Sequence, residues 1–169
     1  MKRSSSAFVF ALIVFAADQI TKFLALEQLR YGQPVEIIQG FFSLTLIYNT
    51  GAAWGTFKAH GPWLTCLSVA ALIFLVKTHR HFTALGALPT TALGLLVGGI
   101  SGNLADRLSH GHVVDFLDFY IGFSWPAFNL ADSAICCGVG LYVLDSLRRE
   151  RQDGHSSGVS SKAGQGLQD

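Results

Sequence analysis

GNLADRLSHGHVVDFLDF, residues 102–119, and FNLADS, residues 128–133, are the two stretches that decide how this chain is organised. Apolar segments long enough to cross a bilayer lie on both sides of them. Together they carry the carboxylates Asp106, Asp115, Asp118 and Asp132. Carboxylates at membrane depth are energetically costly, and they therefore indicate a functional site.

The chain of 169 residues has the composition of a membrane protein. Hydrophobic residues make up 50% of it and charged residues only 14%, whereas a soluble domain carries about 25% charged residues. The mean hydropathy is +0.41. A formal net charge of +1 gives no reason to expect nucleic acid as a partner. Cys66, Cys136 and Cys137 lie in apolar runs without metal-site spacing, so we expect packed free thiols.

Four apolar segments are each expected to form a membrane-spanning helix, since about 20 residues suffice to cross the hydrocarbon core. A charged start and an apolar run also fit a cleavable signal peptide, which leaves that alternative open for the first segment. Pro89 is a candidate for a kink in the third segment. The four segments are residues 7–26, 62–76, 82–100 and 126–147.

Glycines in the third segment predict a close helix contact. Gly94, Gly98 and Gly102 lie four residues apart, which places them on one helix face. Small residues on such a face let a neighbouring backbone approach closely. We therefore expect another helix to pack against this face.

The segment between the first two helices predicts a small antiparallel sheet at the membrane surface. Residues 35–38 and 42–48 have the composition of short strands, and the second alternates between two unlike faces. Gly40 separates them and suits a turn. Asn49 ends the second strand, so it is interpreted either as a turn residue or as a site residue. The fold class is thus a mainly α membrane protein with four transmembrane helices and a small periplasmic antiparallel β-sheet.

Loop charges predict the orientation of the chain. Basic residues precede the first helix, follow the fourth, and occupy a predicted loop at residues 77–81. Positive loops stay in the cytoplasm, so both termini are expected inside and the sheet, with Asp115, outside. Residues 1–151 are expected to form a single domain. Residues 152–169 are rich in Gly and Ser, which predicts a disordered cytoplasmic tail.

Three helices are expected to bring polar groups to the same depth, because residues three or four apart share a helix face. The first helix would contribute two of these groups, the third three and the fourth two. Ion pairs of purely structural value are the alternative for Asp18 with Lys22 and for Asp106 with Arg107. The residues are Asp18, Lys22, Asn103, Asp106, Arg107, Asn129 and Asp132.

Asp115 and Asp132 have no basic residue within four positions. Two such carboxylates that meet share a proton, as in aspartic proteases, because both cannot ionise at close range. One can then act as general base on water while the other donates a hydrogen bond. Asp118 is interpreted as a surface carboxylate. His110 and His112 with Asp115 form a weak metal candidate, and we expect neither a metal nor another cofactor.

The chain resembles the lipoprotein signal peptidase (signal peptidase II) family of bacterial inner-membrane aspartic peptidases. Five blocks carry this resemblance in the order of the family. They are Asp18-Gln19 with Lys22, Tyr48-Asn49-Thr50-Gly51-Ala52-Ala53, Gly102-Asn103-Leu104-Ala105-Asp106-Arg107, Val113-Val114-Asp115-Phe116 and Phe128-Asn129-Leu130-Ala131-Asp132-Ser133. Trp54 stands where the family pattern leads us to expect phenylalanine.

The resemblance implies that Asp115 and Asp132 are the catalytic pair of an intramembrane endopeptidase. It implies cleavage of diacylglyceryl-modified prolipoproteins just before the lipid-bearing cysteine, in contact with membrane lipid and open to globomycin-type inhibitors. It also implies a multi-pass protein of the bacterial inner membrane with its active site near the periplasmic face. Supporting roles fall to Asp18, Lys22, Asn49, Gly51, Asn103, Asp106, Arg107 and Asn129.

Two other kinds of protein would also place carboxylates in a membrane. An ion-coupled transporter could use them as a proton relay, but the sequence has no internal repeat of the kind that transporters show. A non-catalytic assembly factor could use the glycine face of the third helix as its interface. Cleavage of a lipidated precursor by the purified protein separates these possibilities.

Overall fold

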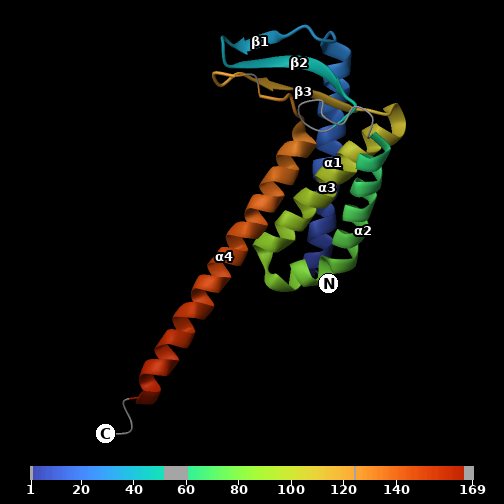
Figure 1. The fold of residues 1–169 in the computed structure, drawn as a ribbon. Helices are drawn as coiled ribbons and strands as arrows, with labels where there is room; N and C mark the ends of the chain where they lie inside the picture. Colours follow the sequence, from blue (N-terminus) through green and yellow to red (C-terminus); the bar gives the residue numbers. More distant parts are fainter. Residues whose placement is uncertain (1, 52–60, 124, 166–169) are drawn as a thin grey trace.

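The computed structural model describes residues 2–51, 61–123 and 125–165. Within these residues, long helices form an upright bundle and a three-stranded sheet lies across one end of it (Figure 1). The mainly helical fold with a small antiparallel sheet is confirmed. The elements are α1 (Lys2–Gln28), β1 (Val35–Ile38), β2 (Phe42–Asn49), α2 (Gly61–Leu85), α3 (Ala87–His110), β3 (Val113–Phe119) and α4 (Leu130–Gln165).

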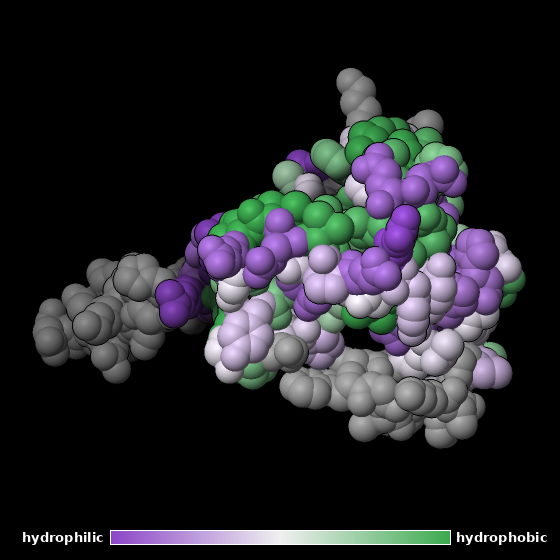
Figure 2. All heavy atoms as spheres, turned by 90° about the horizontal axis from the view of Figure 1, so that it is seen from above, coloured by the Kyte–Doolittle hydropathy of each residue, from purple (hydrophilic) through white to green (hydrophobic). Residues whose placement is uncertain are grey.

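The outer surface of the bundle is apolar. In the described part of the chain, four helices are long and apolar enough to cross a membrane. Large side chains such as Leu12, Ile73 and Leu144 are exposed on α1, α2 and α4, as expected for helix faces that contact lipid. Figure 2 looks onto the sheet end and shows hydrophilic residues spread over it among hydrophobic ones.

Helix α3 is the centre of the bundle, and α1, α2 and α4 all pack on it. The glycine face contacts α1, as predicted. A Cβ on Gly98 would stand 2.6 Å from the Ala11 carbonyl oxygen and 2.7 Å from the Val14 Cβ. On the opposite side, a Cβ on Gly99 would stand 2.6 Å from the Ala131 carbonyl oxygen of α4. Because α1 covers this face, it is not available as the interface of an assembly factor.

The sheet has the order β1-β2-β3 and all its pairs are antiparallel. Gly40 forms the β1–β2 turn with a φ of 67°, as the sequence predicted. The third strand, β3, was not predicted, because Val113 and Val114 are both apolar and break the alternation that marks a strand. Both are buried. In the β2–β3 pair, Ile47 faces Asp115, so the sheet fixes the position of this aspartate.

Two helix boundaries differ from those that the sequence predicted. The basic residues 77–81 are helical and belong to α2, and the connection lies instead at Gly86, whose φ is 134°. Arg149 of α4 donates a hydrogen bond to the carbonyl oxygen of Leu85 at this turn. Pro89 does not kink α3, because it lies in the first turn of the helix, where its missing N–H is tolerated.

Helix α4 also differs from expectation at both ends. It begins at Leu130 instead of near Pro126, because Phe128 pairs with Leu117 of β3. It continues to Gln165, through much of the segment expected to be a disordered tail. An existing helix extends without a new nucleation step, so a weakly apolar sequence can prolong it. The division into a domain of residues 1–151 and a tail stays a prediction.

The three cysteines are free but not packed as expected. Cys66, Cys136 and Cys137 are exposed on the surfaces of α2 and α4, because they point away from α3. Cys66 and Cys137 lie on exposed faces of apolar helices, where a small hydrophobic residue is suitable, and Cys136 lines a pocket described below.

We predict that Gly98→Leu will weaken the α1–α3 contact, because the new side chain would overlap backbone atoms of α1. The free energy of unfolding should fall by about 1–3 kcal/mol, as for other overpacked cores. Reversible unfolding in mixed micelles measures it. The control is Gly140→Leu on α4, where a Cβ meets nothing within 4 Å. Equal stability of the two variants would contradict the close packing of this face.

Candidate active site

Asp115 of β3 and Asp132 in the first turn of α4 come to the same site because the chain between them folds back on itself. Phe128 donates to the Leu117 carbonyl oxygen at 3.0 Å, and the Phe128 carbonyl oxygen accepts from the Leu117 N–H at 2.8 Å. This closure returns the chain to β3 just before α4 begins. Asp115 is 1% exposed, and Asp132 lies near enough to influence its charge.

Asn129 connects the two aspartates directly. Its side-chain amide donates to Asp115 Oδ1 at 2.7 Å, while its backbone N–H donates to Asp132 Oδ2 at 3.3 Å. In return, its Oδ1 accepts from the Asp132 N–H at 2.9 Å. This reciprocal pattern is a helix N-cap. The residue that starts α4 therefore also fixes both carboxylates.

Asn103 of α3 supports the pair from below. Its Nδ2 donates to Asp132 Oδ1 at 2.8 Å. Its Oδ1 accepts from Asn129 Nδ2 at 3.1 Å and from Lys22 Nζ at 2.8 Å. The amide orientation is thereby set, because one side receives only donors and the other meets a carboxylate.

Lys22 of α1 holds a buried ion network beneath the aspartates. Its Nζ lies 2.8 Å from Asp18 Oδ2 and 2.9 Å from Asp106 Oδ2, and the residue is only 2% exposed. Asp18 accepts from the Ala131 N–H at 2.9 Å, and Asp106 accepts from the Val114 N–H at 3.0 Å. The two carboxylates thus hold the backbone next to Asp132 and next to Asp115.

Asp18 and Lys22 form the ion pair that their spacing suggested, but Asp106 pairs with Lys22 instead of Arg107. Sequence reasoning also left out one member of the network. Gln19 donates to Asp18 at 3.2 Å, to Asp106 at 3.1 Å and to the Gly102 carbonyl oxygen at 3.3 Å. Its position next to Asp18 in the first motif was the available signal.

Asn49 combines the two interpretations that the sequence left open. Its Oδ1 accepts from the Gly51 N–H at 3.0 Å, as in a turn, and its Nδ2 donates to Asp115 Oδ2 at 2.8 Å. Gly51 is buried beside it. Residues 52–54, which include the last part of this motif and Trp54, lie outside the described residues.

Burial raises the pKa of Asp115 to about 7. The nearby charge of Asp132 raises it as well, whereas hydrogen bonds from Asn49 and Asn129 and the charge of Lys22 lower it. A carboxyl group with this pKa is about half protonated at neutral pH. Asp115 can therefore either accept or donate a proton there, as general acid–base catalysis requires.

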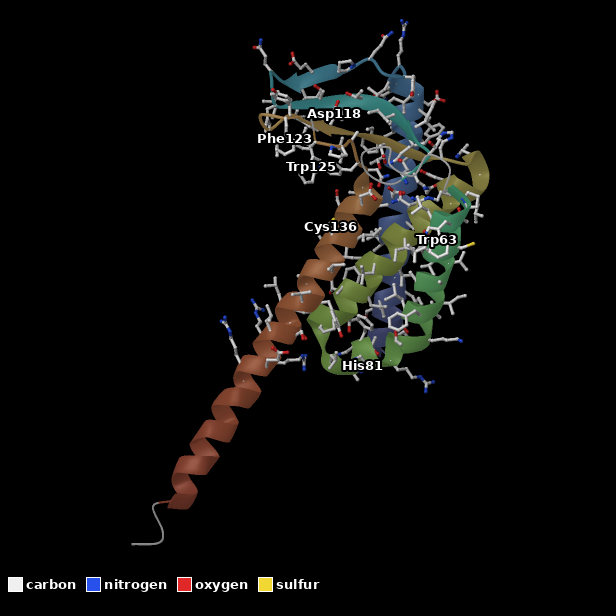
Figure 3. The ribbon with its side chains drawn as sticks, in the orientation of Figure 1. Trp63, His81, Asp118, Phe123, Trp125 and Cys136 are labelled. Carbon is white, nitrogen blue, oxygen red and sulfur yellow. The ribbon has the colours of Figure 1, made fainter. Side chains whose placement is uncertain are left out.

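A pocket of about 500 Å³ opens beside Asp132. Asn49, Arg107 and Asp132 form part of its polar wall, and Trp125, Phe128 and Cys136 form part of its apolar wall. Figure 3 shows Trp125 beneath the sheet, with Cys136 on the helix α4 below it. Arg107 donates to the Asn103 carbonyl oxygen at 3.4 Å and lies within electrostatic reach of both aspartates.

Asp118 and the histidines lie apart from this arrangement. Asp118 accepts from Thr45 Oγ1 at 2.8 Å. The ring of His112 packs on Tyr48 with centroids 4.5 Å apart, and His110 lies next to it at 5.8 Å. Among the described residues, no group of three or more His, Cys, Asp or Glu side chains is arranged to hold a metal ion.

A buried and a half-buried aspartate linked by one asparagine at the end of a membrane-spanning bundle, next to a partly apolar pocket, are typical of a membrane-embedded aspartic peptidase. Residues 10–148 match the model of the family described as signal peptidase (SPase) II. The chain belongs to the signal peptidase II family of aspartic peptidases. This confirms the resemblance that the five motifs indicated.

Relatives and solved structures agree with this assignment. The chain is 46% identical over 149 residues to a lipoprotein signal peptidase of Burkholderia mallei, covering 83% of this chain and 87% of the relative. It is 47% identical over 149 residues to a lipoprotein signal peptidase of Paraburkholderia phymatum, again covering 83% of this chain and 87% of the relative. A bacterial membrane enzyme solved by the in meso method at 2.3 Å is similar with a TM-score of 0.73 and 31% identity. That likeness covers 85% of this chain and 88% of the other.

We predict that Asn49→Ala will raise the pKa of Asp115 further, because the lost hydrogen bond stabilises the charged carboxylate. Infrared titration of the carboxyl band in purified protein measures this shift. Thr45→Ala is the matched control, since Thr45 donates to Asp118 and not to Asp115. An unchanged or lowered pKa in Asn49→Ala would contradict the role assigned to this contact.

Proposed function

We propose that this chain removes the signal peptide from prolipoproteins that already carry a diacylglyceryl group, and that it cleaves just before the lipid-bearing cysteine. Asp115 and Asp132 carry out the hydrolysis. The observation that carries this assignment is the shared support of the two carboxylates by Asn129, at 2.7 Å and 3.3 Å. The lipoprotein signal peptidases to which the chain is similar support the choice of substrate.

Hydrolysis needs one proton to be shared between the two carboxyl groups. The ionised carboxylate takes a proton from a water molecule, whose oxygen attacks the carbonyl carbon of the scissile peptide bond. The protonated carboxyl hydrogen-bonds to the carbonyl oxygen and stabilises the tetrahedral intermediate. When the C–N bond breaks, a carboxyl proton passes to the departing amine. The pair therefore supplies both acid and base.

Arg107 is a candidate for holding the substrate. It lines the pocket beside Asp132, and it donates a hydrogen bond to the backbone carbonyl oxygen of Asn103. A guanidinium group has five N–H donors in a fixed plane, so it suits backbone carbonyl oxygens of an extended peptide. The apolar wall of Trp125 and Phe128 suits the lipid-bearing end of the substrate, and globomycin-type inhibitors would occupy the same pocket.

The orientation in the bacterial inner membrane follows from the distribution of charge. Figure 1 shows both termini at the end of the molecule opposite the sheet. Arg3 lies in the first turn of α1, and Lys77 and Arg80 lie in the last third of α2. Arg148 precedes Arg149, which contacts the α2–α3 turn at that end. Positive residues stay on the cytoplasmic side. The termini are therefore cytoplasmic, and the sheet and the aspartates lie at the periplasmic face.

We predict that reporter fusions at Gly32 and at the C-terminus will behave oppositely. A reporter that is active only in the periplasm should work at Gly32, between α1 and β1, and fail at the C-terminus. A fusion at Gly86, in the α2–α3 turn, should behave like the C-terminal one. Equal behaviour at Gly32 and the C-terminus would contradict the proposed orientation.

We predict that Asp115→Asn and Asp132→Asn will each lower cleavage of a lipidated precursor by at least about 10²–10⁴-fold. The double variant should be little worse than either single one, because the two groups act as a unit. The assay uses purified protein and the same precursor with and without its lipid.

Asp118→Asn is the control, since Asp118 bonds to Thr45 and takes no part in the site. It should keep near wild-type turnover. The wild-type pH profile should be bell-shaped, with apparent pKa values that belong to the pair. A tenth of wild-type turnover in either single variant would contradict the two-aspartate mechanism, and equal cleavage of the precursor without lipid would contradict the proposed substrate.

A further inference from the structure

A second pocket lies at the opposite end of the bundle from the aspartates, between the start of α1 and the end of α2. Its volume is about 880 Å³. The residues that line it are Arg3, Ser4, Ser5, His79, Arg80 and Thr83, with Ala84 beside them. Figure 3 shows the neighbouring His81 at this lower end of the molecule. The proposed reaction does not use this pocket.

The pocket is positively charged. Arg3 comes from α1 and Arg80 from α2, and both are exposed. Among the described residues, neither forms an ion pair, and no carboxylate is among those that line the pocket. Two uncompensated guanidinium groups facing one hollow favour an anion, and planar guanidinium groups suit phosphate oxygens in particular.

Two polar side chains beside the arginines are held by backbone carbonyl oxygens of α2. Thr83 donates its hydroxyl proton to the Arg80 carbonyl oxygen at 3.2 Å. The Nδ1 of His79 lies 2.7 Å from the Val76 carbonyl oxygen, so it carries the proton that this contact needs. The imidazole ring is thereby oriented at the wall of the pocket.

Exposed apolar side chains of α1 and α2, which we call the seam, continue from this pocket along the bundle. Helices α1 and α2 each pack mainly on α3 and contact each other little. The ring of Phe8 lies beside His79, with centroids 5.9 Å apart. Phe8 is 44% exposed, and Leu12, one helix turn further along α1, is 67% exposed. On α2, Ile73 and Val76 are exposed within two turns of Arg80.

We propose that this pocket binds the phosphate of an anionic phospholipid, whose acyl chains lie along the seam between α1 and α2. The pocket is at the level where helix ends reach the membrane surface, which is where lipid phosphates lie. Basic pockets between membrane helices bind anionic headgroups for this reason. A free phosphate ion would use the arginines but would leave the seam without a function.

The experiment uses the full chain, purified in a neutral detergent, and native mass spectrometry to count bound lipids. Short-chain phosphatidylglycerol should bind at one site, and phosphatidylcholine of the same chain length should bind at least about tenfold more weakly. Arg3→Gln and Arg80→Gln should each weaken phosphatidylglycerol binding about five-fold, and the double variant roughly 25-fold.

Lys77→Gln is the matched control, because it removes the same charge one turn from Arg80 at an exposed position outside the pocket. It should keep wild-type binding. All variants should keep the wild-type unfolding temperature and precursor cleavage in neutral detergent. Equal phosphatidylglycerol binding by the double variant and Lys77→Gln would overturn the proposal. Displacement of the lipid by millimolar inorganic phosphate would show a soluble anion as the occupant and would also overturn it.

Discussion

Lys22 places one positive charge between the carboxylates of Asp18 and Asp106, and all three side chains are almost fully buried. Asp18 and Asp106 also accept from backbone N–H groups, Asp18 from Ala131 next to Asp132 and Asp106 from Val114 next to Asp115. Breaking a buried ion pair by removing one partner costs about 3–5 kcal/mol, since the other charge is left uncompensated. The position of β3 and the start of α4 therefore both depend on a cation supplied by the first helix. Removal of α1 would leave Asp106 buried without its cation.

The glycine face of α3 makes this network possible. A Cβ on Gly102 would overlap the carboxylate of Asp18, so only glycine leaves room for the acid at that height. Gly98 brings the α1 backbone close one turn lower. The same glycine face therefore packs α3 against α1 and makes room for the Asp18 carboxylate. All buried side-chain nitrogen and oxygen atoms in the described residues have hydrogen-bond partners, as a polar cluster in apolar surroundings requires.

The features that the sequence predicted well are those that depend on local spacing. Helix periodicity placed Asn103 and Asp106 on one face, and the glycine spacing predicted the contact with α1. Features that depend on tertiary contacts were missed. Asp106 pairs with Lys22 instead of Arg107 because α1, which carries Lys22, packs against α3. Strand β3 forms because β2 lies beside it. Helix α2 continues through its basic residues because their side chains can reach water at the end of the bundle.

The hairpin between β3 and α4 separates the shape of the pocket wall from the positions of Asp115 and Asp132. Its ends are fixed by the hydrogen bonds between Leu117 and Phe128, and the aspartates lie outside this closure, one on each side. The tip of the hairpin, including Trp125, can therefore change in length or sequence while the distance between the carboxyl groups stays the same. The pocket wall can thus vary between related proteins without moving the proposed catalytic pair, Asp115 and Asp132. A change in which substrates fit the pocket would then need no change at the two aspartates.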